Sequence, residues 1–217
     1  LRGNDFLVLH RNVFNPSPNY NDIIRFSGAQ RPGPVLAAYD NIFNGSTDEC
    51  FDLNNCDAHL EGNVFMNVRL STPRNSTANA VAINNESSVT LTRNLFHNVD
   101  HAVLAKNGAD CQFENNTVVN ATIAAINLNE PLRPNTLPAD SVDLESNIFL
   151  ECNAIFAYPE EVEVTGSRNI LPEDDHWIGD GNLALNPFLY NLAGGPLPRD
   201  NWKPLPDSPA IGSGKAL

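Results

Sequence analysis

The chain has few charged residues, few basic residues and no long apolar run. Charged residues make up 18% of its 217 residues, and 13 Lys and Arg stand against 26 Asp and Glu, which gives a formal net charge of −13. A surface this negative repels phosphate backbones and anionic headgroups, so we expect no nucleic-acid partner. No apolar run approaches the roughly 18 residues of a membrane-spanning helix, so we expect no membrane insertion.

Cysteine is also scarce. Four residues are too few for a disulfide scaffold, and they form no CxxC pair that would indicate structural zinc. Cys50 and Cys56 are close enough in sequence to close a short loop, and the sequence leaves their pairing open. The chain begins at Leu1 without a signal peptide, so we expect a processed form or a piece of a longer protein.

What the sequence does contain is an internal repeat. A tripeptide of Asn, then an aliphatic residue or Thr, then Phe, Val or Leu occurs seven times. Its Asn residues are Asn12, Asn41, Asn63, Asn94, Asn116, Asn147 and Asn169. They are separated by 29, 22, 31, 22, 31 and 22 residues, so the unit has 22 residues and the longer steps add seven or nine. Such regularity indicates a repeat architecture.

Each unit shows the period-two alternation of β-strands. Apolar residues stand five and three positions before each Asn, and a second alternating segment follows it. Two or three short strands in 22 residues make one coil of a parallel β-helix, in which each strand pairs with its counterpart about 4.8 Å away. We expect the Asn side chains to stack inside as a ladder that satisfies backbone groups at the bends. Phe14, Phe43, Phe65, Phe96 and Phe149 are expected to stack beside it. The alternative is that the Asn residues only mark turns.

These Asn and aromatic ladders resemble those of the pectate-lyase-like right-handed parallel β-helix superfamily over roughly residues 5–171. The tail from Asn186-Pro187-Phe188 to Gly214 is similar to the closing segment of many secreted bacterial members. The resemblance implies an all-β chain: a right-handed parallel β-helix, a single-stranded solenoid of about seven coils, at 1–171, and an irregular C-terminal cover at 172–217. It also implies a module of a larger secreted protein, extracellular or on the cell surface, with further domains in the same chain.

An outward row of polar residues is expected on the second alternating segment. If Ile24 and its equivalents point inward, the row contains Ser27, Asn54, Asn84, Lys106, Asn127 and Tyr158. Amides, an ammonium group and a ring edge about 4.8 Å apart suit the hydrogen bonding and stacking of sugars. We therefore predict that a polysaccharide or surface glycan binds at Asn54, Asn84, Lys106, Asn127 and Tyr158. The alternative is an ordinary solvated strand face.

Acidic residues on neighbouring coils predict a calcium site. Asp22, Asp48 and Asp52 offer the carboxylate oxygens that Ca²⁺ prefers. The alternative is an ion pair between Asp52 and Arg25, which neutralises one of these ligands.

The same region resembles the calcium-and-base region of alginate and chondroitin lyases. Elimination from a uronide needs a base and a neutraliser of the carboxylate charge. This chain has Asn54 or Asn55 in place of the base lysine, and Ile83 or Asn84 in place of the arginine. The remaining candidate catalytic residues are Lys106, His101, Asp52 and Arg25. We expect a carbohydrate-binding module without catalysis. A polysaccharide lyase acting on an acidic glycan is the alternative, and a structural spacer is the second.

Overall fold

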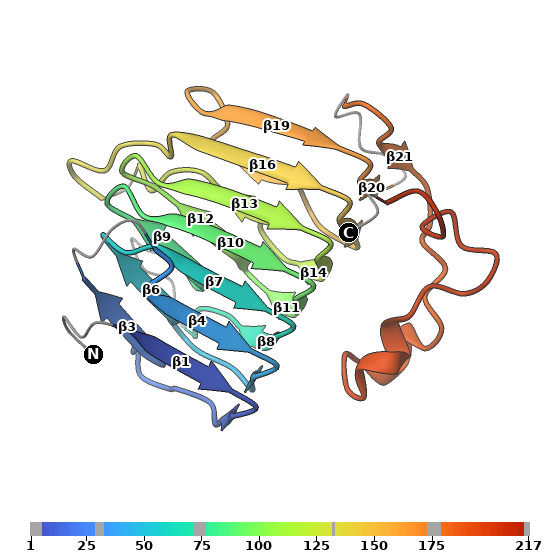
Figure 1. Cartoon of the computed structure of the whole chain (residues 1–217), viewed down its shortest axis with the longest axis horizontal. Coiled ribbons are helices and arrows are strands. Elements are labelled where there is room, and N and C mark those ends of the chain that lie inside the picture. The colour runs from blue at the N-terminus through green and yellow to red at the C-terminus, as the bar shows by residue number, and fades with distance from the viewer. Residues whose placement is uncertain (1–5, 29–32, 72–76, 132, 173–178, 215–217) are drawn as a thin grey trace.

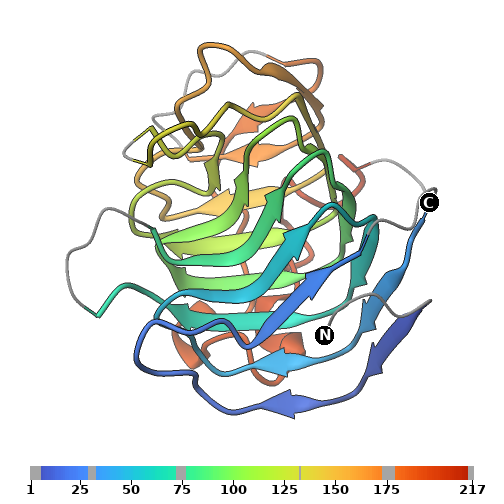
Figure 2. The ribbon, with the colours of Figure 1, turned by 90° about the vertical axis from the view of Figure 1, so that its left-hand side faces the viewer.

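The computed structural model describes residues 6–28, 33–71, 77–131, 133–172 and 179–214. The strands in these residues form three parallel sheets, and up to residue 171 consecutive strands of the chain enter the three sheets in turn (Figure 1). Each complete coil therefore contributes one strand to each sheet, and Figure 2 shows the coils stacked from the blue N-terminal strands to the orange strands. The predicted parallel β-helix is confirmed.

The three sheets are long and regular. The first contains β1 (Leu7–His10), β4 (Leu36–Tyr39), β7 (Ala58–Glu61), β10 (Ser88–Thr92), β13 (Asp110–Glu114), β16 (Ser141–Glu145) and β19 (Glu163–Ser167). The second contains β2 (Val13–Phe14), β5 (Ile42–Phe43), β8 (Val64–Val68), β11 (Leu95–Val99), β14 (Thr117–Ala121), β17 (Ile148–Leu150), β20 (Ile170–Leu171) and β21 (Leu183–Ala184). The third contains β3 (Ile24–Ser27), β6 (Glu49–Asn54), β9 (Asn79–Asn84), β12 (His101–Ala105), β15 (Ile126–Asn127) and β18 (Phe156–Ala157).

The Asn residues form the predicted interior ladder. The backbone N–H and the side-chain Nδ2 of Asn63 both donate to Oδ1 of Asn94, at 2.9 and 3.0 Å. Nδ2 of Asn63 also donates to the carbonyl oxygen of Ala38 at 2.9 Å. The Asn-to-Asn bonds repeat coil after coil from Asn12, and the last acceptor is Asn182. The ladder therefore continues one position beyond Asn169, the last Asn predicted from the repeat.

A tight bend precedes each ladder Asn. The residue before it has a positive φ in every coil, as in Asp40 (54°), Gly62 (68°) and Arg93 (55°). This left-handed conformation costs a non-glycine residue about 1–2 kcal/mol. The neighbouring Asn hydrogen bonds offset that cost, because they satisfy backbone groups that the bend removes from the strand ladders.

Phenylalanine rings fill the interior beside the ladder. Phe43 stacks on Phe65 with centroids 4.9 Å apart, and Phe65 stacks on Phe96 at 5.0 Å. The predicted Phe stack is confirmed this far, but Val118 occupies the next position of the second sheet. Phe113 of β13 fills the gap from the first sheet, with its ring 5.7 Å from that of Phe96 and 6.2 Å from that of Phe149. The stack thus changes sheets for one coil, because the small Val118 leaves room for a ring.

The C-terminal segment packs along the outside of the second sheet, where Figure 1 shows it in orange and red after β21. It includes the 3-10 helices η1 (Leu192–Gly194) and η2 (Arg199–Trp202). Trp202 is 3% exposed and packs with Val64, Leu95 and Val119 of that sheet. Among the described residues, no helix is long and apolar enough to span a membrane.

Candidate functional site

The predicted outward row on the third sheet begins as expected. Ser27 lies opposite Asn54, and Asn54 lies opposite Asn84. The amides bond to each other: Nδ2 of Asn84 donates to Oδ1 of Asn54 at 3.0 Å, and Nδ2 of Asn107 donates to Oδ1 of Asn84 at 2.7 Å. Much of the hydrogen-bonding capacity of these amides is thus used within the protein.

The predicted register is wrong farther along the third sheet. Asn127 lies opposite Leu104, two positions from the row that contains Lys106, and it is 1% exposed. The cause is a turn before β15, in which the N–H groups of Ile123 and Ala124 both point to the carbonyl oxygen of Asp100 at 3.3 Å. Ile126, and not the expected Ala124, takes the inward position opposite Val103. Tyr158 follows the end of β18 with φ 58° and is 46% exposed.

A loop covers this part of the third sheet. We call residues 128–131 and 133–140 the cover loop; it follows β15 and returns to β16. Nζ of Lys106 donates to the carboxylate of Glu130 in this loop, and their side chains are 9% and 4% exposed. Arg133 of the loop also lies 3.3 Å from Glu130 and donates to the hydroxyl oxygen of Tyr20 at 3.0 Å. Lys106 is therefore held in a buried ion pair beneath the loop.

Acidic side chains gather next to the cover loop. Ligand atoms of Asp22, Asp48 and Glu49 all lie within 4.8 Å of one another. The sequence predicted Asp22, Asp48 and Asp52, but Glu49 is the third member, and Asp52 instead lies 3.1 Å from Nε of Arg25. The calcium prediction itself stays a prediction.

The surroundings of these acids disfavour the charged form. Burial, and then the hydrogen bonds that the protonated carboxyl group of Glu49 donates to Asp48 and Asp22, raise the pKa of Glu49 to about 11. Burial also raises the pKa values of Asp48 and Asp52 above their usual range, with the charge of Asp22 acting in the same direction on both. In the absence of a cation, the Glu49 carboxyl group keeps its proton at neutral pH.

His101, one of the candidate catalytic residues, is buried in the third sheet, and its catalytic role stays a prediction. His101 is 1% exposed and lies opposite Asn79, which in turn lies opposite Glu49. Burial lowers the pKa of His101 to about 4, so its ring is neutral at pH 7. Asp100 accepts hydrogen bonds from the N–H of Leu70 at 2.8 Å and from Oγ1 of Thr122 at 2.7 Å, so it holds a corner of the coil.

The first sheet, by contrast, has an open polar outer face. Its strands end in one row of facing residues, which are His10, Tyr39, Glu61, Thr92, Glu114, Glu145 and Ser167. In a parallel row on the same face, Val8, Gln112, Asp143 and Thr165 are exposed to solvent. We call this surface the first face. No described segment covers these four residues, whereas the cover loop buries Lys106 on the third sheet.

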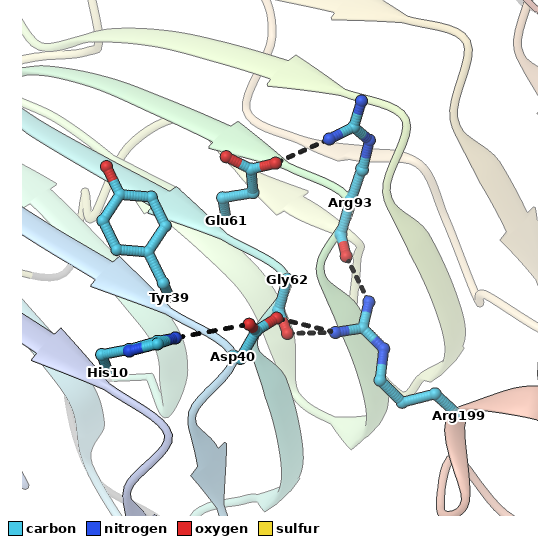
Figure 3. A pocket seen from close by; sticks show the side chains of 7 residues that line it. All are labelled: His10, Tyr39, Asp40, Glu61, Gly62, Arg93 and Arg199. Atoms are coloured by element: carbon cyan, nitrogen blue, oxygen red, sulfur yellow. Dashed lines mark hydrogen bonds and ion pairs between the residues drawn. The ribbon is translucent and has the colours of Figure 1, made fainter.

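A pocket of about 460 Å³ lies at one end of the first face (Figure 3). Its lining residues are His10, Tyr39, Asp40, Glu61, Gly62, Arg93 and Arg199. A second hollow of about 260 Å³ lies at the start of the strands and includes His59. The rings of His59 and Tyr39, one from each hollow, have centroids 5.7 Å apart.

Charged groups in the pocket are already paired. Nη1 of Arg93 donates to Glu61 at 2.6 Å, and Nε2 of His59 lies 3.1 Å from the other oxygen of Glu61. The hydrogen bond with His59, aided by the charge of Arg93, holds the pKa of Glu61 below its usual range. The carboxylate of Glu61 is therefore ionised at neutral pH and positioned by two partners.

Arg199 reaches this pocket from the C-terminal segment (Figure 3). Its guanidinium group donates to the backbone carbonyl oxygens of Gly62 and, at 2.8 Å, of Arg93. These two carbonyls belong to the left-handed bends of successive coils. A Cβ atom on Gly62 would lie 2.6 Å from Oδ1 of Asp40 and 3.3 Å from Nη1 of Arg199, so a side chain here would displace the ends of both side chains.

The residues of the first face were not among the predicted site residues. A signal for them exists in the sequence, because every residue of the row stands two positions before a ladder Asn. The alternation that places the residues three and five positions before the Asn inside also places these residues outside. The prediction concentrated on the segment after the Asn and did not weigh this row.

Comparison with known proteins gives one match. The family model described as the right-handed beta helix region matches residues 24–173, which is more than half of the chain. No curated protein and no solved structure matches the chain. The match and the three parallel sheets agree with the pectate-lyase-like resemblance at the level of fold. The chain therefore belongs to the right-handed β-helix family.

Proposed function

We propose that this β-helix is a carbohydrate-binding module and that a neutral polysaccharide or surface glycan binds to its first face at the pocket of Figure 3. The observation that carries the proposal is an open hollow of about 460 Å³ that combines the Tyr39 ring with positioned carboxylates and guanidinium groups. An extracellular or cell-surface location and further domains in the same chain, as the resemblance implies, belong to this proposal.

The chemistry of the pocket supports a sugar ligand. An aromatic ring offers an apolar surface to the C–H face of a pyranose, and its hydroxyl remains available for hydrogen bonding. Glu61 and Asp40 are acceptors for sugar hydroxyls, and His10 adds a ring nitrogen.

The repeat supports a polymeric ligand. The row containing Tyr39 continues along seven strands, about 4.8 Å apart, through Thr92, Glu114 and Glu145. Each coil thus presents a polar side chain at the same height. A linear glycan that lies along the row meets a hydrogen-bonding group at most of the coils, with the coil of Thr92, which is 8% exposed, as an exception.

Charge supports a neutral ligand over an acidic one. The net charge is −13, and the first face carries Glu61, Glu114, Asp143 and Glu145. Arg93 is paired with Glu61, and Arg168 lies 2.6 Å from Glu145. A uronate polymer would meet repulsion without a dedicated partner for its carboxylates. The proposal assigns no catalytic step to the site.

Binding measurements on matched tyrosine variants test the proposal. The chain is titrated calorimetrically with neutral polysaccharides (xylan, mannan and β-glucan) and with alginate, pectate and chondroitin. We expect binding to at least one neutral polymer, a loss of about tenfold or more in Tyr39→Ala, and a comparable loss in Glu61→Gln. Tyr190→Ala, at a 68% exposed tyrosine of the C-terminal segment, is the control.

The variant Tyr158→Ala distinguishes binding at the first face from binding at the row predicted on the third sheet. If the first face binds the glycan, this variant of the third-sheet residue binds like the wild type. A loss in Tyr158→Ala with normal binding by Tyr39→Ala would instead support the row predicted from the sequence and contradict the proposal. Failure of every polymer to bind would also contradict it. Unsaturated products from an acidic glycan would support the lyase alternative.

A further inference from the structure

Residues 188–205 of the C-terminal segment fold into a unit of their own, which we call the strap. The N–H of Tyr190 donates to the carbonyl oxygen of Lys203 at 2.9 Å. The N–H of Leu205 donates to the carbonyl oxygen of Phe188 at 2.8 Å. These bonds close the strap at its base, and the 3-10 helices η1 and η2 lie between them. The strap is thus held together by its own hydrogen bonds.

An apolar contact holds the strap on the outer face of the second sheet. It is a hydrophobic cluster separate from the one that fills the coils, and its buried members are Val64, Leu95, Val119, Leu189 and Trp202. Nε1 of Trp202 is buried and has no acceptor among the described residues, so docking takes this N–H out of water without replacing its hydrogen bond. A peripheral unit of this kind can leave the sheet while the coils stay folded.

The short helix that carries Trp202 also carries Arg199, which reaches the pocket of the first face (Figure 3). Only three positions separate the two residues in η2, so a strap that leaves the second sheet also withdraws Arg199 from the pocket. At the pocket, Nη1 of Arg199 lies 3.8 Å from Oδ1 of Asp40. The strap therefore contacts two different outer faces of the coils at once.

Arg199 has hydrogen-bonding capacity for a ligand. A guanidinium group carries five N–H donors, and the carbonyl oxygens of Gly62 and Arg93 accept two of them. The side chain lines the pocket and is 39% exposed. In the docked strap it presents N–H groups to sugar hydroxyls beside the carboxylate of Asp40. Without the strap, the pocket loses this donor and one of its walls.

We propose that the strap is part of the glycan site and that glycan binding and strap docking stabilise each other. The inference rests on the proposed function of the first face. With the strap docked, Arg199 completes the pocket, and with the strap away the same pocket binds the glycan more weakly. Because the coupling of two equilibria is reciprocal, a glycan that prefers the docked form in turn holds the strap on the second sheet. Arg199 contacts the ligand, and Trp202 acts through it as a positioning residue.

Affinity measurements on strap variants give the first test. Trp202→Ala removes the indole contact with the second sheet, away from the ligand, and should weaken binding of the neutral polymer by about fivefold or more. Arg199→Ala should weaken it at least as much. Because Trp202 acts through Arg199, the double variant should bind no more weakly than Arg199→Ala alone. Ile211→Ala, at a 58% exposed residue of the C-terminal segment, is the control and should bind like the wild type.

Protease cleavage gives the second test and needs no change in the sequence. Proteinase K cleaves the strap when it leaves the sheet, and mass spectrometry quantifies the cuts within residues 188–205. A saturating neutral glycan should slow these cuts in the wild type by about fivefold or more, because it favours the docked strap. In the absence of glycan, Trp202→Ala should be cut faster than the wild type.

The outcomes separate failure of the coupling from failure of the proposed function. If no neutral polymer binds, or if Tyr39→Ala binds like the wild type, the proposed function is wrong and the coupling is overturned with it. If Tyr39→Ala loses binding but Trp202→Ala keeps it, only the coupling is overturned. Additive losses in the double variant, or cuts in the strap that the glycan does not slow, would overturn it as well. If Trp202→Ala does not fold, the wild-type cleavage and the affinity of Arg199→Ala decide.

Discussion

The first and third sheets arise from the same repeat, but their outer faces differ. Glu61 on the first face pairs with Arg93, and their side chains are 32% and 50% exposed. Glu130 over the third sheet pairs with Lys106, and their side chains are 4% and 9% exposed. Inward and outward side chains alternate along the strands in the same way in both sheets, so the difference comes from the segments that cover each outer face. An open face is available to a ligand, whereas a covered face places its charges in the interior of the protein.

The largest expected difference concerns these two ion pairs. Glu130→Gln leaves the ammonium of Lys106 buried without its carboxylate, so the free energy of unfolding should fall by about 3–5 kcal/mol. Glu61→Gln breaks an exposed pair and should cost about 1 kcal/mol or less. Urea unfolding of the two variants measures both. Equal losses would show that the two faces do not differ as described.

Histidines on the two faces give the second comparison. Burial lowers the pKa of His101 to about 4, and the charges of Asp100 and Glu130 only partly oppose it. The unfolded chain, with a histidine pKa of about 6.5, therefore binds more protons than the folded chain between pH 6.5 and 4. Stability from His101 is fully present above pH 6.5 and is lost as the pH falls toward 4, by about 2–3 kcal/mol.

Unfolding from pH 7.5 to 4.5 checks this expectation with two variants. Relative to the wild type, His101→Gln should gain about 2–3 kcal/mol of stability as the pH falls from 7.5 to 4.5, because it lacks the buried group whose protonation opposes folding. His10→Gln, on the exposed first face, is the control. A difference between His101→Gln and the wild type that stays constant over this interval would contradict the expectation.

The Asn ladder lies in the interior beneath both outer faces, so removing one ladder Asn should lower stability without changing ligand binding at either face. Asn94→Ala removes the acceptor of two donors on Asn63 and the donor to the carbonyl oxygen of Leu60, so it should cost about 1–3 kcal/mol. Because the ladder is interior, the folded variant should keep its glycan affinity. A loss of less than about 0.5 kcal/mol in urea unfolding would contradict the structural role of the ladder.

Much of the fold follows from local pattern. The fixed position of Asn63 and Asn94 in each unit predicted the coil, the interior ladder and the parallel pairing. The register at Asn127 did not follow, because a two-residue difference in the turn before β15 leaves the alternation of apolar residues unchanged. Phe113 takes the place in the Phe stack that a ring at position 118 would have filled. This arrangement depends on packing between two sheets, which the sequence of a single repeat does not specify.

The candidate site was less predictable, because it depends on segments that lie outside the repeat. Whether Lys106 or Tyr39 is accessible depends on where the cover loop and the C-terminal segment lie, and neither segment carries the repeat. Asp22 and Asp48 were placed together because they occupy adjacent coils. The preference for Glu49 over Asp52 depends on the direction of each side chain at the start of β6, and on the competing contact of Asp52 with Arg25.

Carboxyl footprinting tests most directly the claim that the open first face binds the ligand. The chain is labelled at its exposed carboxyl groups with and without a saturating neutral polysaccharide, and each site is quantified by mass spectrometry. The account predicts reduced labelling at Glu61 and Glu114, and unchanged labelling at Asp52 and at the exposed Asp207. Protection at Asp52, with Glu61 and Glu114 labelled as fully as in the free protein, would contradict it.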